Sequence, residues 1–416
     1  MKKVVKGEQG QALILLTVGL ITLLAFTGLA IDMGRLYSER RTVQGASDTT
    51  SLTGALYLGQ YDGDITSGVI DDAINAALYR AVDNGYPLED VQVSIDRDGT
   101  YYVVTTFIQS EIPPTIIQLV YNGPLRVRTK SVARVFRVLE FGFGNALYAL
   151  SDTQKNALEF TGSGQIEIIG AGMYSNSNHS DNSVSFSGSS ISVLTDAVTS
   201  AGGIYVLKPE NIQTIDGTQF NDYQASLEAL GGSFYVPTPD CSKLPDGVRT
   251  KTGSDVHFTA GVYSEITENV PGNYTFDPGF YCINGAFTTQ NGNFDGTGVS
   301  FYVATGNVSL GGNVNFTAPT DGTAVDSSGH SWNGMLLHVA AGKLTINGNA
   351  DSYYEGTVYV PTPGNPSCKL NGSSDSDGYN MQLVCDSINV NGDGSLIIEY
   401  DGSNSYVPPI KIDLDE

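Results

Sequence analysis

The strongest constraint on the fold is an uncharged run of twenty residues near the N-terminus, from Ala12 to Ile31. At about 1.5 Å rise per residue, a helix of this length crosses the roughly 30 Å hydrocarbon core of a bilayer. Lysines precede the run and Asp32 follows it. The sequence therefore predicts a transmembrane helix over residues 12–31, with the lipid bilayer as its partner.

The helical pattern continues beyond the run, because small and apolar residues recur on one side up to about residue 58. This predicts a helical stalk that leaves the bilayer. The alternative is a cleaved signal peptide, with Gly28 and Ala30 as the small residues of the cleavage site. The run is longer than the 7–15 apolar residues typical of a signal peptide, which favours a retained anchor.

The basic residues beside the run do not fix its orientation, since three lie on each side. All four cysteines lie in the C-terminal part of the chain, whose low content of charged residues also suits an oxidising exterior. We expect a single-pass protein of the cytoplasmic membrane, with the N-terminus inside and the large C-terminal part outside.

Charged and small residues follow the run at fixed spacing. A Gly-Leu-Ala-x-Asp-x-Gly-Arg pattern closes the helix, an Arg-x-x-Gln-x-Ala-x-Asp pattern follows, and a Leu-x-Gly-Ala ending comes last. The segment resembles the N-terminal segment of TadG-like Flp (tight adherence) pilus-assembly proteins. The residues that carry the resemblance are Gly28, Leu29, Ala30, Asp32, Gly34, Arg35, Arg41, Gln44, Ala46, Asp48, Leu52, Gly54 and Ala55.

The resemblance implies an envelope protein of the Flp pilus system that is held by this helix and has no catalytic activity. Its implied partners are other pilus-assembly or envelope proteins. The chain departs from pilins at one point. Prepilin-type cleavage would follow a glycine such as Gly7 or Gly10, but neither frame places a glutamate at the fifth position of the mature chain.

The balance of charges changes near residue 140, where we expect a domain boundary. Residues 1–137 hold 13 basic and 14 acidic residues, whereas residues 138–416 hold 8 and 30. We divide the chain into an anchor and stalk (1–58), a small α+β domain (59–140) and a β-rich domain (141–416).

The small α+β domain is predicted to contain one helix, over residues 71–82, and a hairpin around Asp98-Gly99. A further strand over residues 125–138 carries basic residues on one face. That face either touches lipid headgroups or an acidic partner, or is the solvated face of a half-buried strand.

Residues 141–416 alternate short apolar runs with turns of glycine, asparagine and serine. The fold class that we predict is mainly β, with a right-handed parallel β-helix-like solenoid in this part of the chain. A β-sandwich gives the same alternation and is the alternative. Prolines between residues 212 and 281 predict a loop-rich insertion that interrupts the stack.

The sequence offers no starting point for catalysis or for binding a cofactor or metal. No two of the four histidines have metal-ligand spacing, and P-loop and Gly-x-Ser-x-Gly patterns are absent. Asp181, Ser183 and Ser185 match a metal-dependent adhesion pattern, but they lack the apolar strand that precedes such a site. We predict no enzyme activity, no cofactor and no metal. The net charge of −23 excludes nucleic acid as a main partner.

Tyrosines near the C-terminus predict either a carbohydrate-stacking strip or packing between the rungs of a solenoid. The residues concerned are Tyr353, Tyr354, Tyr359, Tyr379, Tyr400 and Tyr406. Two function classes follow. The first is a membrane-anchored, non-catalytic structural protein of Flp-type pilus assembly or surface display. The second is a surface polysaccharide-binding adhesin, or a β-helix polysaccharide lyase or hydrolase.

Four cysteines permit three pairings. On sequence proximity alone, we pair Cys241 with Cys282 and Cys368 with Cys385. The first bond would tie the proline-rich segment to the next rung, and the second would bracket a loop rich in glycine and serine. Closing such loops typically stabilises a fold by about 2–4 kcal/mol.

Overall fold

The chain divides into two compact units in a computed structural model. The first unit is Met1–Arg137 with Ile410–Glu416, and the second is Val138–Pro409. The structure describes residues 9–61, 65–98, 101–119, 121, 123–136, 141–214, 236–349, 351–372, 379–392, 395–400 and 402–415.

The first unit begins with α1 (Gln9–Gln60), which covers the predicted anchor and stalk in one continuous helix. Side chains of the apolar run, such as Leu16 and Phe26, are exposed, whereas Val43, Ala55 and Leu58 are buried. The C-terminal half of α1 packs on α2 (Ser67–Asp83) and on the sheet of this unit. Alanines 73, 77 and 81 make the buried face of α2, so the two helices approach closely.

The sheet of the first unit is antiparallel and has the order β1-β2-β3-β31. Its strands are β1 (Val91–Asp98), β2 (Tyr101–Ile112), β3 (Leu125–Phe136) and β31 (Lys411–Asp415), with the short 3-10 helices η1 (Leu88–Asp90) and η2 (Ile117–Leu119) beside them. The predicted boundary at 141–416 is wrong at its end, because β31 pairs with β3. The physical reason is that Ile412 packs with the apolar cluster of Ala55 and Val135.

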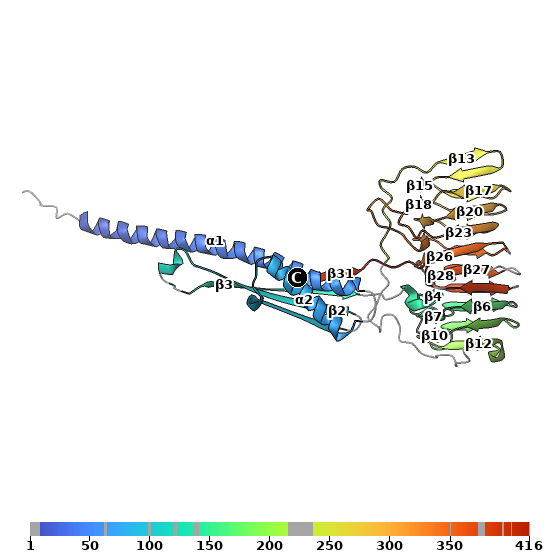
Figure 1. Cartoon of the computed structure of the whole chain (residues 1–416), viewed down its shortest axis with the longest axis horizontal. Coiled ribbons are helices and arrows are strands. Elements are labelled where there is room, and N and C mark those ends of the chain that lie inside the picture. Colours follow the sequence, from blue (N-terminus) through green and yellow to red (C-terminus); the bar gives the residue numbers. More distant parts are fainter. Residues whose placement is uncertain are drawn as a thin grey trace, which may run out of the picture. The chain divides into compact units, whose positions relative to one another are not determined.

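The second unit is built from parallel strands, which form three columns (Figure 1). Strands of the first column are β6 (Gln165–Ile169), β9 (Ser192–Thr195), β12 (Ile212–Thr214), β14 (Asp255–Phe258), β17 (Asn273–Phe276), β20 (Asn293–Thr297), β23 (Asn313–Thr317), β26 (Tyr353–Val360), β28 (Tyr379–Cys385) and β30 (Ser395–Glu399). Those of the second are β4 (Leu147–Ala149), β7 (Met173–Ser175), β10 (Val198–Ser200), β15 (Gly261–Tyr263), β18 (Gly279–Ile283), β21 (Val299–Val303) and β24 (Met335–Val339), together with the ends of β26 and β28.

The third column is a separate sheet. It contains β5 (Leu158–Gly162), β8 (Val184–Phe186), β11 (Ile204–Val206), β16 (Ile266–Glu268), β19 (Phe287–Thr289), β22 (Val308–Leu310), β25 (Leu344–Asn347), β27 (Cys368–Gly372) and β29 (Ile388–Gly392). Outside the columns lie η3 (Phe141–Gly144), η4 (Pro209–Asn211) and β13 (Arg249–Thr252), which pairs antiparallel with β14. The prediction of a mainly β chain with stacked parallel strands is confirmed, and the antiparallel sandwich is not the arrangement found.

The order of the rungs differs from the order of the chain. In the third column the order is β11-β8-β5-β29-β27-β25-β22-β19-β16, so the chain enters the stack in its middle. It winds to one end through β11, crosses to the other end, and winds back to β29, which pairs with β5. One rung is composite. Its strand β30 comes from the C-terminal end of the second unit, whereas β4 and β5 come from the N-terminal end of that unit. In Figure 1 the red and green rungs meet at this point.

The predicted insertion at 212–281 is wrong for its second half. Strands β14 to β18 lie in this range and pair in parallel with later rungs. Two of the prolines that suggested a loop occupy turns between strands instead, since Pro271 precedes β17 and Pro278 precedes β18. Pro237, Pro239 and Pro245 lie in a stretch without a named strand. Part of the range, residues 215–235, lies outside the described residues.

Two apolar layers stabilise the second unit. The inner layer lies between the columns and includes stacked ring pairs, such as Phe160 with Phe186 and Phe258 with Phe276. The outer layer lies on the second column, where β18, β21 and β24 are buried on both faces. It is closed by what we call the covering segments, residues 236–247, 319–333 and 402–409, which contribute Trp332 and Tyr406 to it.

Candidate functional site

The motif residues lie on α1, and the first group of them holds a loop of the same unit. This docked loop (residues 113–119) follows β2, contains η2 and lies against the end of the apolar run. Asp32, directly after the run, is 2% exposed. Its carboxylate accepts hydrogen bonds from the backbone N–H of Thr115 (3.0 Å), Ile116 (2.9 Å) and Ile117 (2.7 Å), and from the Thr115 hydroxyl.

Asp32 therefore caps η2 from another helix, because its oxygens take the N–H groups that the start of a helical turn leaves unpaired. The Thr115 hydroxyl and then the Ile117 N–H hold the pKa of the carboxyl at about 2, although desolvation opposes them. The carboxylate stays charged at neutral pH and needs no water to satisfy it.

Gly28 and Arg35 complete the contact with the loop. They lie four residues before and three residues after Asp32, so the three share one face of the helix. Gly28 is buried, and a Cβ added there would overlap Cγ2 of Ile116. Arg35 donates from Nη1 to the carbonyl of Pro113 at 3.3 Å and lies 3.9 Å from the Asp32 carboxylate. Gly28 thus leaves room for Ile116, and Arg35 binds the first carbonyl of the loop.

The second group of motif residues joins α1 to the sheet. Gln44 donates to Asp48 (2.8 Å) and to the carbonyl of Lys130 in β3 (3.3 Å). Buried hydroxyl pairs continue this seam, Ser47 with Thr129 at 2.6 Å and Ser51 with Ser131 at 2.8 Å.

The last motif residues are small and lie in the packed interior. Gly54 is close to α2 and β2, where an added Cβ would come within 3.1 Å of Val104 and 3.4 Å of Ala77. Ala46 and Ala55 are buried. Leu52 is half-buried against the core of this unit. The remaining motif residues Leu29, Ala30, Gly34 and Arg41 are exposed.

The basic face of β3 is engaged within its own sheet. Arg126 forms an ion pair with Glu111 at 2.6 Å, and the Arg128 guanidinium lies 4.8 Å from the centroid of the Phe107 ring. Val127 and Ala133 on the same strand are buried. These contacts favour the reading of a half-buried strand with a solvated face.

Both disulfides lie in the second unit. Cys241 is bonded to Cys282, and Cys368 is bonded to Cys385, with 6.2 Å between the Cα atoms of each pair. The first bond fixes a covering segment to β18. The second joins β27 to β28, and both of its cysteines are fully buried.

The proposed carbohydrate strip is wrong, because its tyrosines are not on the surface. Tyr354, Tyr379 and Tyr406 are at most 1% exposed, and Tyr359 and Tyr400 are also buried. Only Tyr353 is partly exposed, and its hydroxyl donates to Glu355 at 3.0 Å. Packing between rungs and beneath the covering segments accounts for these rings.

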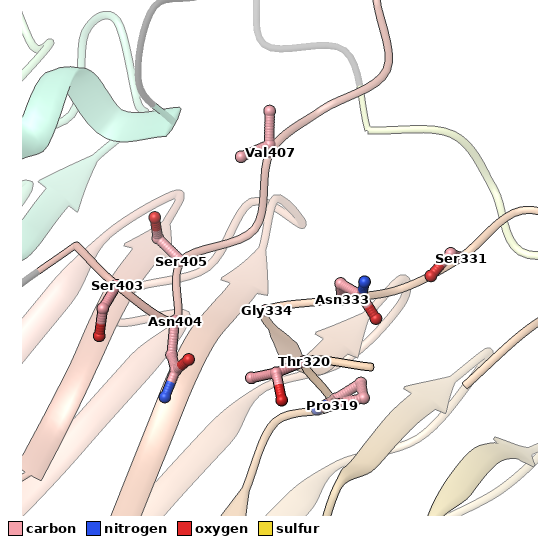
Figure 2. A pocket seen from close by; sticks show the side chains of 9 residues that line it. All are labelled: Pro319, Thr320, Ser331, Asn333, Gly334, Ser403, Asn404, Ser405 and Val407. Carbon is pink, nitrogen blue, oxygen red and sulfur yellow. The ribbon is translucent and has the colours of Figure 1, made fainter. Parts of the chain in front are cut away.

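A shallow depression of about 350 Å³ lies where two covering segments face each other. Figure 2 shows that its lining comes from residues 319–334 and 403–407. Hydroxyl and amide groups predominate, such as those of Thr320, Asn333 and Asn404, so it offers hydrogen bonds without a charged group. Within the part of the chain that the structure describes, no three His, Cys, Asp or Glu side chains are grouped to hold a metal.

Comparison with known proteins identifies the N-terminal segment. Residues 10–56 match the family described as "Putative Flp pilus-assembly TadE/G-like". This confirms the resemblance. The matched range contains the apolar run, the residues that contact the docked loop (Gly28, Asp32 and Arg35) and the residues that join α1 to β3 (Gln44, Ser47 and Ser51). No curated protein matches the chain. Among the described residues, α1 is the one helix that is long and apolar enough to cross a membrane.

Sequence reasoning identified Asp32 and Arg35 as motif residues but missed their partners. The docked loop is some eighty residues further along the chain, and only the closed unit brings the two together. One signal was present. Pro113 and Pro114 cannot donate to a strand ladder, so they predict that the strand ends directly before an apolar stretch.

Proposed function

We propose that the chain is a membrane-anchored, extracytoplasmic structural protein of Flp (Tad) pilus assembly or surface display, and that it is non-catalytic. The observation that carries this proposal is the position of the family match. Residues 10–56 contain the exposed apolar run and also the face on which the first unit is assembled. The family segment is therefore both the anchor and the foundation of the folded part.

The apolar run would span the cytoplasmic membrane once, with residues 1–11 in the cytoplasm. Its exposed side chains and its length support this, since a core helix of a soluble protein would be buried. The two disulfides support an oxidising compartment for the second unit.

The second unit would serve as rigid surface structure, wound as a right-handed parallel β-helix. Stacked rungs bury a continuous core, and exposed asparagines form a ladder along the stack. In that ladder Asn293 donates to Asn273 and Asn313 donates to Asn293, each at 3.0 Å. An excess of acidic residues keeps such a surface soluble and discourages self-association.

Topology is tested by adding protease to intact spheroplasts that contain the full chain. The proposal expects digestion of residues after about 35, while a tag placed before Met1 stays protected until the membrane is opened. A mature protein that begins at Ile31 and is released from the membrane would instead establish the signal-peptide alternative.

Assembly is tested in a host that carries Flp pilus genes. The chain is crosslinked in its membranes, purified through a tag and examined for Flp pilus proteins. The matched control keeps residues 33–416 and replaces the preceding residues with an unrelated single-pass anchor, which separates membrane residence from the apolar run of the family segment. The proposal fails if both chains capture the same proteins, or if deletion of the gene leaves piliation and surface display unchanged.

A further inference from the structure

A second element of the first unit lies beside the apolar run, at the level of its last turns. Ile116 of the docked loop meets Gly28, which lies four residues before Asp32. At about 1.5 Å per residue, Gly28 lies roughly 6 Å along the helix axis from Asp32, the first charged residue after the run. If the run spans a bilayer, Ile116 lies at the depth to which interfacial segments enter a leaflet, about 5–10 Å.

The composition of the loop fits an apolar surrounding. Ile116 remains 36% exposed beside Gly28, and Tyr121 just after the loop is 48% exposed. On the neighbouring face of α1, Met33 and Tyr37 are exposed as well. Tyrosines are enriched at the boundary between lipid and water, where the ring is buried and the hydroxyl stays hydrated.

The first five residues of the loop leave no backbone N–H unpaired, which meets part of the requirement that excludes most loops from a membrane. Pro113 and Pro114 have no N–H, and the N–H groups of the next three residues donate to Asp32. Asp32 in turn is satisfied by those donors and by the Thr115 hydroxyl. These hydrogen bonds reduce the cost of placing a carboxylate at this depth.

We infer that the docked loop is a second membrane contact, which enters the outer leaflet beside the anchor and fixes the first unit against the lipid surface. Asp32 is the positioning residue, because it holds the loop to the helix. The ligand is the lipid interface itself. The inference rests on the proposed anchoring of α1 and adds to it a defined depth and orientation of the first unit.

The test uses the full chain reconstituted into phosphatidylcholine vesicles, with Tyr121→Trp as a depth probe. The control is Tyr79→Trp, the same change at a 73% exposed position on α2. This helix packs on the C-terminal half of α1, away from the apolar run. Lipids brominated near the headgroup end of the acyl chains quench a tryptophan that reaches them. We expect loss of most of the emission added by Tyr121→Trp and no loss for Tyr79→Trp, with Trp332 as a constant background.

Two outcomes would overturn the inference and can be told apart. If the protein floats with the vesicles but Tyr121→Trp is not quenched, the anchor stands and the loop does not enter lipid, which leaves a protein surface as its partner. If the protein does not float with the vesicles, the anchor and the loop contact fall together. Adding Asp32→Asn to Tyr121→Trp should reduce the quenching, while adding Asp48→Asn, a carboxylate on the same helix outside the loop contact, should leave it unchanged.

Discussion

Val135 and Ile412 lie opposite each other in neighbouring antiparallel strands, although residues 136–411 separate them in the chain. The second unit is therefore an insertion between two strands of the first. Its two connections leave from strands that are hydrogen-bonded to each other, and the composite rung brings the same two ends of the insertion together again. In the first unit β3 pairs with β31, and in the second unit the first strands, β4 and β6, pair with the last strands, β28 and β30.

Substitution of Ile412 tests this closure. Ile412→Ser removes an apolar side chain from the cluster of Ala55 and Val135, and we expect a loss of about 1–2 kcal/mol in the stability of the first unit. Hydrogen exchange of the β3 amides in the full chain measures it. Leu414→Ser on the same strand is the control, because Leu414 is 42% exposed and should cost less. Equal effects would contradict the assignment of β31 to this core.

Gly28→Ala is predicted to unseat the docked loop. The added Cβ overlaps the branched side chain of Ile116, whose Cβ would itself lie only 2.8 Å away, so the backbone of the loop must move. We expect faster proteolysis within residues 113–121 and a cost of about 1–3 kcal/mol. Gly34→Ala is the matched control, since nothing lies within 4 Å of it, and it should stabilise α1 slightly. Similar proteolysis of the two variants would refute the contact.

The loop contact should resist acid because of Asp32. The Thr115 hydroxyl and backbone N–H groups lower the pKa of Asp32 to about 2 in the folded protein, from 3.8. A lowered carboxyl pKa stabilises the fold above the unfolded value, and this contribution is lost as the pH falls from about 4 toward 2. Proteolysis of the loop by an acid protease should therefore stay slow down to about pH 4. In Asp32→Asn it should be fast at every pH, and a pH-independent rate in the wild type would contradict the role of the charge.

How far the sequence predicted this molecule depends on the range of the interactions. The long helix, the hairpin whose strands pair Asp98 with Tyr101, and the short rungs are encoded by neighbouring residues, so periodicity and turn signals revealed them. The pairings of β5 with β29 and of β3 with β31 join residues more than two hundred positions apart, and no local pattern specifies them. Proline turns were mistaken for an interruption because turns between rungs and long loops share their composition.

In the candidate site, too, local features could be predicted from the sequence, whereas long-range contacts could not. The long apolar helix and the motif residues could be predicted from spacing, but the role of Asp32 depends on a loop that only the tertiary fold supplies. For the tyrosines, the sequence left a surface strip and packing between rungs both open. In the structure Tyr354, Tyr379 and Tyr400 lie in the inner layer between the columns, and Tyr359 lies in the outer layer with the covering segments.

His338 should make the second unit sensitive to mild acid. It is buried beneath Trp332, Tyr302 and Tyr359, and desolvation lowers its pKa to about 4 from 6.5. Between these values the unfolded chain binds more protons, so stability falls as the pH falls, by about 2 kcal/mol from pH 7 to pH 5. Urea unfolding at the two pH values measures this difference.

Desolvation also lowers the pKa of His330, which adds a change of the same sign. His338→Phe keeps the aromatic packing and should remove most of the pH dependence. His257→Phe, at an exposed position, should retain it. A wild-type difference that survives in His338→Phe would assign the effect to other groups.

The two disulfides should differ in their resistance to reduction. Cys368 and Cys385 are both fully buried, whereas Cys241 in a covering segment is partly exposed. Mild reductant followed by alkylation and peptide mapping should label Cys241 and Cys282 first. Serine in place of both members of either pair should cost about 2–4 kcal/mol. Free thiols in the protein isolated from the cell exterior would contradict both bonds and the oxidising location.

The insertion of the solenoid between β3 and β31 also determines how tension would pass through the protein. A pull on the solenoid loads both connections in one direction, so β3 and β31 share the force and their mutual hydrogen bonds are not sheared. The load then passes into the ladder between β2 and β3, which pairs twelve residues of each strand, and through the seam on α1 toward the anchor. A unit that is connected through two strands would therefore withstand a higher load than one connected through a single peptide segment.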